Sequence, residues 1–424
     1  MPNQTNLDPF VPEVLENPYE VFTELRRCGV YQLPDTSMFI MTRFRDVEYV
    51  LMHPELFSVH GLTEGLTRDT PEIREIEAQG WPDVNVLSKA DPPEHTGYRS
   101  VVNRPFSAQS VKKLEPRLQE IADRLIDTCL KSTAIEFVSQ FAQPFPLYVF
   151  AELMGLPEED IPRVKRWCDA RIERMGGTMI SHERELACVR LAVEFQHYLF
   201  HQIEARRAAP RDDLISHMVT ASVEKFGGRS LTTEELISMI DIILLGGNDT
   251  TINLLSSGLA LLLQNPEQLE LVTADPSLIP NFVEEAMRIE SPVQCLFRTV
   301  KEDTRMDGVR LPKGSRVAVM YGAANRDAEQ FPDPDRFDVR RPNARMSVAF
   351  GAGVHFCLGA SLARLEGKVA FEALLNRLGT LRLAEGKNDF RYAINPVIRG
   401  LKELHIECDP PAGTLGTERP NPRF

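Results

Sequence analysis

Cysteine is scarce in this sequence. Only seven of the 424 residues are cysteines, an odd number, and no two of them form a C-x-x-C pair. This pattern excludes a disulfide framework and argues against a zinc site built from paired cysteines. Free thiols, together with an N-terminus that lacks a basic and apolar leader, predict a cytoplasmic protein.

Positively charged residues are fewer than negatively charged ones, and long apolar runs are rare. Lys and Arg number 48 against 61 Asp and Glu, which gives a formal net charge of -13. An acidic chain does not attract a polyanion, so we exclude nucleic acid as the general partner. The most apolar stretch, residues 236–263, contains Asp241 and Asp249, which argues against a membrane span. We therefore expect a soluble monomer.

Helical periodicity dominates the sequence. Amphipathic patterns predict long helices over residues 115–130, 183–207, 234–264, 280–289 and 358–378. Thr232 and Thr233 ahead of Glu235 form a capping signal for the third helix, which would be about 45 Å long.

Strand patterns are short and few. They cover residues 38–42, 316–320 and 391–394, and a Pro-, Asp- and Arg-rich stretch over 321–350 predicts an ordered coil. The fold class is therefore predicted as mainly α with a minor β region. We expect one domain over residues 1–424, with loosely ordered ends at about 1–16 and 409–424.

The most informative stretch is residues 350–359, which read Phe-Gly-Ala-Gly-Val-His-Phe-Cys-Leu-Gly. It places Cys357 where a loop turns into a helix, and backbone N–H groups at a helix N-terminus favour a thiolate. The glycines let the backbone approach a flat ligand closely. Taken as a short G-x-C pattern alone, a cysteine in a glycine turn is the simpler interpretation.

The complete string resembles the cysteine-ligand loop of the cytochrome P450 haem-thiolate monooxygenases, F-G-x-G-x-H-x-C-x-G, at every fixed position. The resemblance implies haem b with Cys357 as the axial thiolate on the iron and His355 as a donor to a propionate. Phe350 and Gly351 would lie beside the cofactor. It also implies the P450 fold, with haem between the long distal helix and the helix after the Cys loop, over about residues 17–407.

The long predicted helix carries a second signal. Adjacent Gly246 and Gly247 cost about 1 kcal/mol each relative to alanine in mid-helix, and Asp249 and Thr250 follow them. Taken alone, the string is explained equally well by a few polar residues of an otherwise apolar helix that face a crevice. It also resembles the oxygen-activation motif of the same family. The resemblance implies that Thr250 holds a water where O2 binds and that Asp249 connects this water to bulk protons.

Two further groups match positions of the family, although each would otherwise be ordinary surface charge. Glu285 and Arg288 share a helix face at a spacing of three residues. The resemblance assigns a structural brace for the coil to Glu285, Arg288 and Arg336, and haem propionate contacts to His95, Arg99 and Arg298.

Substrate residues are implied only by the resemblance. The family binds its substrate over the distal haem face, and the matching positions here are Val86, Leu87, Ile242, Leu245, Gly246, Gln294 and Val397. These side chains are mostly apolar, and Gln294 is the one obvious hydrogen-bond donor. They favour a terpenoid, aromatic or steroid-like molecule without choosing among these classes.

No glycine fingerprint for a flavin or nicotinamide is present, so electrons must come from a separate protein. In similar members of the family this is an acidic ferredoxin fed by a flavoprotein reductase. A basic patch of Lys112, Lys113, Arg345 and Arg364 would surround the proximal haem face and steer such a partner. The alternative is that these four are dispersed solubility charges.

Three other functions compete with a monooxygenase. The first keeps the haem but uses peroxide or isomerises an oxygenated substrate, and such relatives tend to lose the acid–alcohol pair that Asp249 and Thr250 form here. The second is a haem-free hydrolase built on Cys357 and His355, for which no Asn or Asp partner is evident. The third is a haem carrier or sensor, which would not need the oxygen-activation motif.

Overall fold

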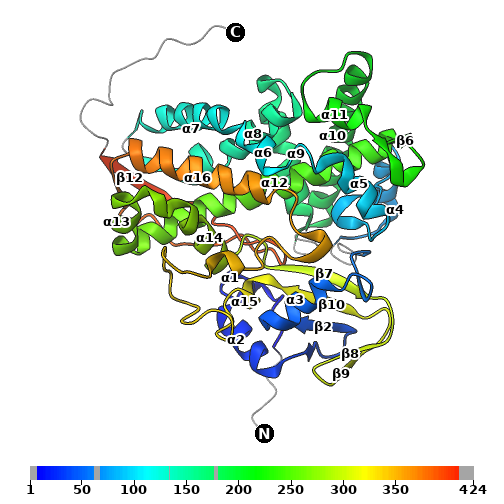
Figure 1. The fold of residues 1–424 in the computed structure, drawn as a ribbon, viewed down its shortest axis with the longest axis horizontal. Helices are drawn as coiled ribbons and strands as arrows, with labels where there is room; N and C mark the ends of the chain where they lie inside the picture. The colour runs from blue at the N-terminus through cyan, green and yellow to red at the C-terminus, as the bar shows by residue number, and fades with distance from the viewer. Residues whose placement is uncertain (1–6, 62–66, 133, 176–179, 410–424) are drawn as a thin grey trace.

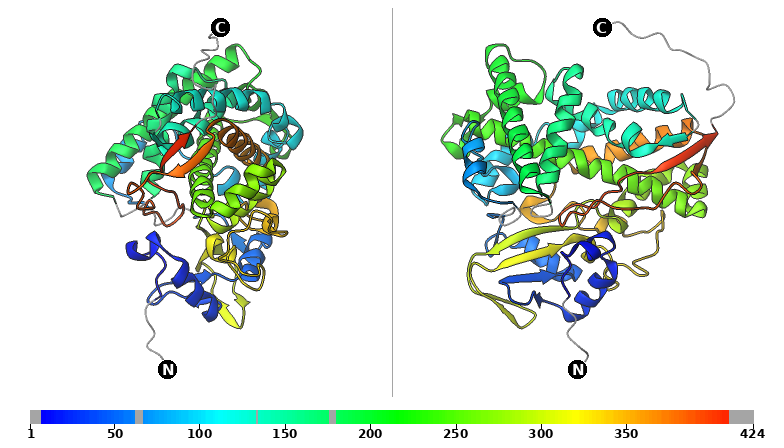
Figure 2. Two further views of the ribbon diagram at one scale, coloured as in Figure 1. Left: turned by 90° about the vertical axis from the view of Figure 1, so that its left-hand side faces the viewer. Right: turned by 180° about the vertical axis from the view of Figure 1, so that it is seen from behind.

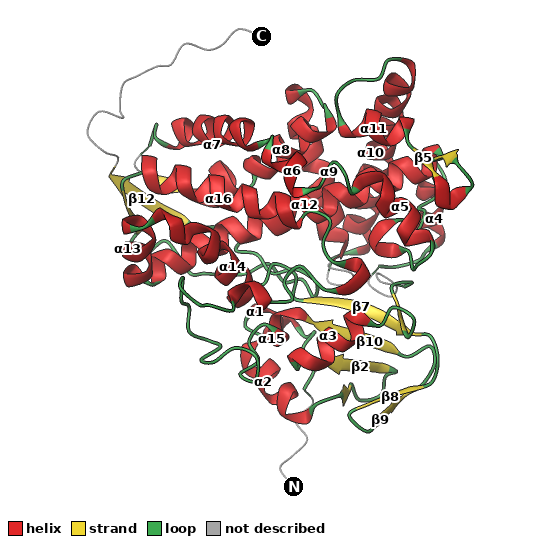
Figure 3. Cartoon of the chain, viewed as in Figure 1, coloured by secondary structure: helices red, strands yellow, loops and turns green. Residues whose placement is uncertain are grey.

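The computed structural model describes residues 7–61, 67–132, 134–175 and 180–409. A large helical region packs on a smaller region built around a sheet (Figure 1). Colouring by secondary structure shows how far helices predominate (Figure 3). The predicted fold class, mainly α with a minor β region, is confirmed. The single-domain assignment stays a prediction, and residues 1–6 and 410–424 of the two expected loose ends lie outside the described residues.

Helices form most of the structure. They are α1 (Pro12–Glu16), α2 (Tyr19–Cys28), α3 (Phe44–Met52), α4 (Pro71–Glu77), α5 (Glu94–Val102), α6 (Ala108–Lys112), α7 (Glu115–Cys129), α8 (Pro144–Met154), α9 (Ile161–Met175), α10 (His182–Ala208), α11 (Leu214–Thr220), α12 (Thr233–Gln264), α13 (Pro266–Ala274), α14 (Ile279–Ile289), α15 (Tyr321–Ala324) and α16 (Ala360–Arg377). The five helices predicted from periodicity correspond to α7, α10, α12, α14 and α16. Residues 12–16, expected in a loose end, instead form α1, and the expected loose Asp409 instead ends a strand.

The long helix α12 is the centre of the helical region. Its first turn is closed by a capping box, because Thr232 Oγ1 accepts from the Glu235 amide and the Glu235 carboxylate accepts from the Thr232 amide. α8, α9, α10, α14 and α16 pack around it, which is why it is apolar on nearly all sides. In the described parts of the chain, no helix is long and apolar enough to cross a membrane.

The strands are β1 (Tyr31–Gln32), β2 (Met38–Met41), β3 (Phe57–Ser58), β4 (Ala134–Glu136), β5 (Ser222–Val223), β6 (Arg229–Ser230), β7 (Cys295–Val300), β8 (Thr304–Met306), β9 (Val309–Leu311), β10 (Arg316–Met320), β11 (Thr380–Leu383) and β12 (His405–Asp409). The largest sheet has the order β1-β2-β10-β7-β3. Within it, β2 and β10 pair in parallel, so the start of the chain lies beside a segment from its last third (Figure 2).

One predicted strand is wrong. Residues 391–394 form no ladder, and only an isolated bridge joins Tyr392 to Leu401. The predicted coil over residues 321–350 is present, with α15 and a short 3-10 turn at Ala344–Met346 inside it. Phe331, Phe337 and Val339 are buried and anchor this coil to the helices. It leads directly into the loop that holds Cys357.

Candidate functional site

A cavity of about 740 Å³ lies between α12 and the loop that precedes α16. Phe350, Gly351, His355 and Cys357 line it on the loop side. α12 contributes Gly246, Gly247, Asp249 and Thr250 to the same lining. The two strongest motifs of the sequence, far apart along the chain, therefore face one space.

The Cys loop has its shape because two glycines adopt left-handed backbone conformations. Gly351 has φ +70 and Gly353 has φ +66, and a Cβ on Gly353 would lie 2.7 Å from the Leu51 carbonyl oxygen. The Cys357 amide donates to the Phe350 carbonyl oxygen at 2.9 Å, which closes the loop. This closure holds the Cys357 thiol at the wall of the cavity.

The electrostatics of Cys357 differ from the expectation for a bare helix start. Burial raises the pKa of the Cys357 thiol, while the Gly359 and Ala360 amides and the Arg99 guanidinium lower it. Because burial outweighs the N–H groups, these groups do not by themselves favour a thiolate here. A coordinated metal ion removes a thiol proton outright, so this buried thiol suits a ligand to iron.

Basic side chains gather at the edge of the same cavity. His95, Arg99, Arg298 and His355 all line it, and the rings of His95 and His355 lie 4.4 Å apart. Both ring nitrogens of His355 are buried without a hydrogen-bond partner among the described residues. Burial, reinforced by His95 and Arg298, lowers the pKa of His355 to about 3. A group carrying carboxylates would complete the hydrogen bonds missing here.

The α12 turn leaves room for a ligand. A Cβ on Gly246 or Gly247 would meet nothing within 4 Å, so these glycines widen the cavity. Thr250 Oγ1 donates to the Gly246 carbonyl oxygen at 2.7 Å. Burial raises the pKa of Asp249 to about 6, although Asn248 Nδ2 donates to its carboxylate at 3.1 Å. Such a carboxyl exchanges protons near neutral pH.

Comparison with known proteins decides the family. The family model described as "Cytochrome P450" matches residues 133–388. Cytochrome P450 107B1 of Saccharopolyspora erythraea is 36% identical over 369 residues, which cover 87% of this chain and 88% of that protein. The chain belongs to the cytochrome P450 family. The vitamin D(3) 25-hydroxylase of Pseudonocardia autotrophica is 34% identical, over 93% of this P450 and 94% of the relative.

A solved structure agrees with the sequence relatives. The crystal structure of CYP109E1 from Bacillus megaterium in complex with testosterone has a TM-score of 0.82 and 30% identity. The alignment covers 94% of this P450 and 100% of that chain. The predicted family, fold and enzyme class, a cytochrome P450 monooxygenase, are confirmed, and so is the cofactor of the family, haem with a cysteine thiolate ligand. Such a group fits the buried thiol, the ring nitrogens of His355 that find no hydrogen-bond partner among the described residues, and the α12 turn that the glycines widen.

Five of the seven predicted substrate residues line the cavity, namely Leu87, Ile242, Leu245, Gly246 and Val397. Val86 and Gln294 require a correction. Val86 is fully buried in the core beside α5. Gln294 Nε2 donates to the Ser291 carbonyl oxygen at 2.7 Å, and its side chain folds over Gly322, away from the main cavity.

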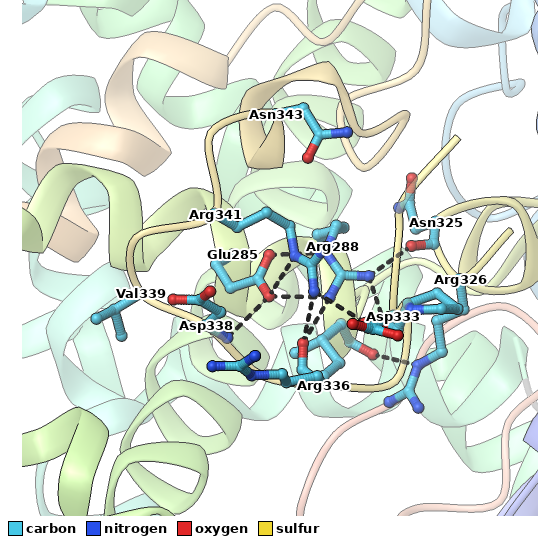
Figure 4. A network of polar contacts seen from close by, with 12 residues as sticks. Glu285, Arg288, Asn325, Arg326, Asp333, Arg336, Asp338, Val339, Arg341 and Asn343 are labelled. Atoms are coloured by element: carbon cyan, nitrogen blue, oxygen red, sulfur yellow. Dashed lines mark hydrogen bonds and ion pairs between the residues drawn. The ribbon is translucent and has the colours of Figure 1, made fainter. Parts of the chain in front are cut away.

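The predicted brace of the coil also needs a correction. Glu285 and Arg288 are fully buried and joined by two hydrogen bonds of 2.7 and 2.9 Å. The second arginine on Glu285 is Arg341, whose Nε donates at 3.0 Å (Figure 4). Arg336 is exposed and contributes only its carbonyl oxygen, which accepts from Arg288 and Arg341. The resemblance therefore located the right stretch of coil but the wrong side chain.

We expect Arg341→Leu to lower the free energy of unfolding of the haem-loaded protein by about 3 kcal/mol. The substitution removes the buried ion pair with Glu285 and the hydrogen bonds to three carbonyl oxygens. The matched variant Arg336→Leu should stay within about 0.5 kcal/mol of the parent, since that side chain is exposed. Denaturant midpoints of the three proteins measure the difference. Equal midpoints for the two variants would contradict this brace.

Sequence reasoning missed a buried acid beside the cavity. Glu366 on α16 is 3% exposed, lines the cavity, and accepts a hydrogen bond from Thr251 Oγ1 at 3.1 Å. Burial raises the pKa of Glu366 to about 8, so it is protonated at neutral pH. Helical spacing was the available signal, because Glu366 shares a face with the buried Val369 and Ala370.

This raised pKa predicts how stability varies with pH. Between the ordinary value of 4.5 and about 8, folded Glu366 keeps a proton that the unfolded carboxylate has released. The parent should therefore lose stability relative to Glu366→Gln as pH rises through this window, by up to about 1.4 kcal/mol per pH unit. Unfolding free energies at pH 5, 6.5 and 8 test it, with Glu372→Gln on the same helix as control. Parallel pH curves for parent and Glu366→Gln would disprove it.

Proposed function

We propose that this P450 inserts one oxygen atom from O2 into an apolar molecule of terpenoid, aromatic or steroid-like class, with Cys357 as the iron ligand. One observation carries the proposal: Cys357 and the Asp249–Thr250 turn line the same cavity. A ligand for the iron and a path for protons are the two contributions a protein makes to this chemistry.

The chain's own residues have separate tasks in holding the haem. Cys357 would ligate the iron, and His355, His95, Arg99 and Arg298 would bind the two propionates at the basic edge of the cavity. Phe350 and Gly351 form the wall next to Cys357. Thiolate-bound haem supplies the dioxygen chemistry, because the thiolate donates electron density that favours O–O cleavage.

Asp249 and Thr250 move protons in this proposal. Thr250 Oγ1 holds a water on the substrate side of the cavity, and the Asp249 carboxyl, with its pKa near 6, passes protons to that water. This pair favours O2 over the two alternatives that keep the haem, since peroxide use and isomerisation need no such delivery. A haem carrier or sensor has no use for it either.

The substrate class is supported by the lining and by the relatives. Leu87, Ile242, Leu245 and Val397 form apolar wall around the α12 turn. One relative is named as a vitamin D(3) hydroxylase, and one similar structure holds testosterone. The cavity volume of about 740 Å³ lies within the usual range for sites that bind small molecules.

The spectrum of the reduced protein under carbon monoxide tests this function. A thiolate-ligated haem gives a Soret band shifted to a wavelength well above that of a histidine-ligated one. Screening a small library of terpenoids, aromatics and steroids for substrate-induced Soret shifts would then identify the substrate class. A reduced protein without the shifted band would refute both the monooxygenase and the peroxide-using alternative.

The electron donor in this proposal is an acidic ferredoxin, reduced by a flavoprotein. Its docking face surrounds the Cys loop, where Val354 and Phe356 are exposed and α6 packs against α16. Lys112 and Lys113 are exposed at the end of α6. Arg345 is 77% exposed, whereas Arg364 is bound to Glu284 at 2.6 Å and stacks on Phe350. Of the four predicted cations, Arg364 is the least available to a partner.

We expect Lys112→Glu and Lys113→Glu to slow reduction by a ferredoxin about tenfold at low salt, because they remove electrostatic steering. The effect should shrink as ionic strength rises. Stopped-flow reduction rates measure it, with Arg345→Glu as a further test and Lys313→Glu in the β9–β10 turn as control. Rates that are flat in salt and equal in all variants would place the docking face elsewhere.

A further inference from the structure

Charged side chains line one end of the cavity. Arg171 and Arg174 lie one turn apart on α9, and they face Asp241 of α12 and Glu77 at the end of α4. Asp241 precedes Thr250 by nine residues, so about 13 Å of helix separates the two. The cavity thus has a polar end well away from the oxygen-activation turn.

The hydrogen bonds at this end are incomplete. Arg171 Nη2 donates to Asp241 at 2.5 Å, and Arg174 Nη2 donates to Glu77 at 2.9 Å. The Nε atom of each guanidinium is buried and has no acceptor within hydrogen-bond distance among the described residues, although the buried Glu185 Oε1 lies 4.0 Å from Arg174 Nε. Arginine carries only donors, so what the cluster lacks is acceptor oxygens at hydrogen-bond distance. Asp241, Glu77 and Glu185 already balance the two cations, so the missing acceptors, and not net charge, decide what binds.

We propose that Arg171 and Arg174 bind acceptor oxygens, those of a carboxylate, an ester or a ketone, at one end of an otherwise apolar substrate. Held there, the substrate presents to the Thr250 turn a carbon about 13 Å from that polar group. This inference rests on the proposed function, and it adds both a substrate class and a site of oxidation.

A second role for the same contacts must be separated from this one. The pairs Arg171–Asp241 and Arg174–Glu77 also fasten α9 to α12 and α4. If these pairs only held the helices together, substituting either the arginine or the carboxylate of a pair would change the affinity for every ligand by the same factor. Recognition of acceptors predicts instead that the arginine and aspartate variants behave differently.

The experiment measures binding of dodecanoic acid, methyl dodecanoate and dodecyltrimethylammonium to the haem-loaded protein, by calorimetry and by Soret shift. The quaternary ammonium has neither an acceptor oxygen nor a lone pair that could bind the iron, so the parent should bind the acid and the ester more tightly than this cation. Arg171→Leu should weaken both by about 10- to 100-fold, the loss of one charge-assisted hydrogen bond. Asp241→Asn should keep or tighten acid binding, since Arg171 then has no competing carboxylate. Oxidation should fall near the methyl end of the acid in the parent and spread along the chain in Arg171→Leu.

Controls make the outcomes decisive. Arg166→Leu removes an exposed arginine of the same helix, paired with Glu194, and should change nothing. If Arg171→Leu fails to load haem, Arg174→Leu and Arg171→Lys carry the same test. Equal affinity for the three probes, tightest binding of the quaternary ammonium, or identical effects of Arg171→Leu and Asp241→Asn would each overturn the inference. A parent without the shifted carbon monoxide band would refute the proposed function instead.

Discussion

Replacing Cys357 with alanine should abolish both the shifted carbon monoxide band and turnover. Among the described residues, Cys357 carries the only thiol that lines the cavity. Without it, no side chain of the loop takes its place, because His355 is directed toward His95 and the basic edge. If His95, Arg99, Arg298 and His355 bind the propionates as proposed, this variant should still hold part of the haem, so the spectrum, and not haem content, is the decisive measurement.

A matched substitution separates this effect from a loss of packing. Cys129 lies on α7 and is buried in the hydrophobic core, outside the cavity. We expect Cys129→Ala to keep the shifted band and turnover, at a modest cost in stability. Cys357→His should bind haem with an unshifted band. Hydroxylation by Cys357→Ala would end the assignment of this residue as the ligand.

Removing the Thr250 hydroxyl should uncouple the reaction. We expect Thr250→Ala to consume reduced cofactor and O2 while releasing hydrogen peroxide in place of product. Asp249→Asn keeps the size and shape of the side chain but cannot carry a proton, so turnover should slow. General acid–base delivery is worth about 10²–10⁴-fold. Product formed per O2 consumed measures the first effect, and the pH profile around 6 measures the second.

Ser256 provides the control for these variants. Its hydroxyl donates to the Ile252 carbonyl oxygen at 2.8 Å, the same i to i−4 contact on the same helix that Thr250 makes with Gly246, but away from the cavity. Ser256→Ala should therefore leave the coupling of O2 to product unchanged. Effects below about twofold in both Thr250→Ala and Asp249→Asn would argue against proton delivery by this turn.

The sequence predicted the elements that depend on local pattern. The bounds of the long helices were predicted to within two residues, because apolar faces and caps depend on residues in neighbouring turns of the same helix. Residues 391–394 show the limit of that reasoning. A strand needs a partner as well as a pattern, and nothing in the local sequence shows that this segment meets Leu401 at a single bridge.

The same contrast between local pattern and long-range contact applies to the candidate site. The Cys loop and the α12 turn are contiguous strings, so resemblance to the family was enough to locate them. Arg341, Glu366 and Arg171 act through contacts with residues far away in the chain, and each was missed or misassigned. The resemblance assigned this role to Arg336, yet the side chain of Arg336 is exposed and Arg341 contacts Glu285 instead. Tertiary packing, which a short motif does not encode, makes that choice.

The parallel pairing of β2 with β10 also sets the timing of folding during synthesis. Met38 and Arg316 are register partners 278 positions apart. At about 5–20 residues per second, the ribosome needs roughly 15 to 55 s to supply the missing strand. For that time, one edge of β2 has no neighbour and is open to pairing with other chains. Since the Cys loop emerges later still, Cys357 can bind haem only after β10 has been synthesised.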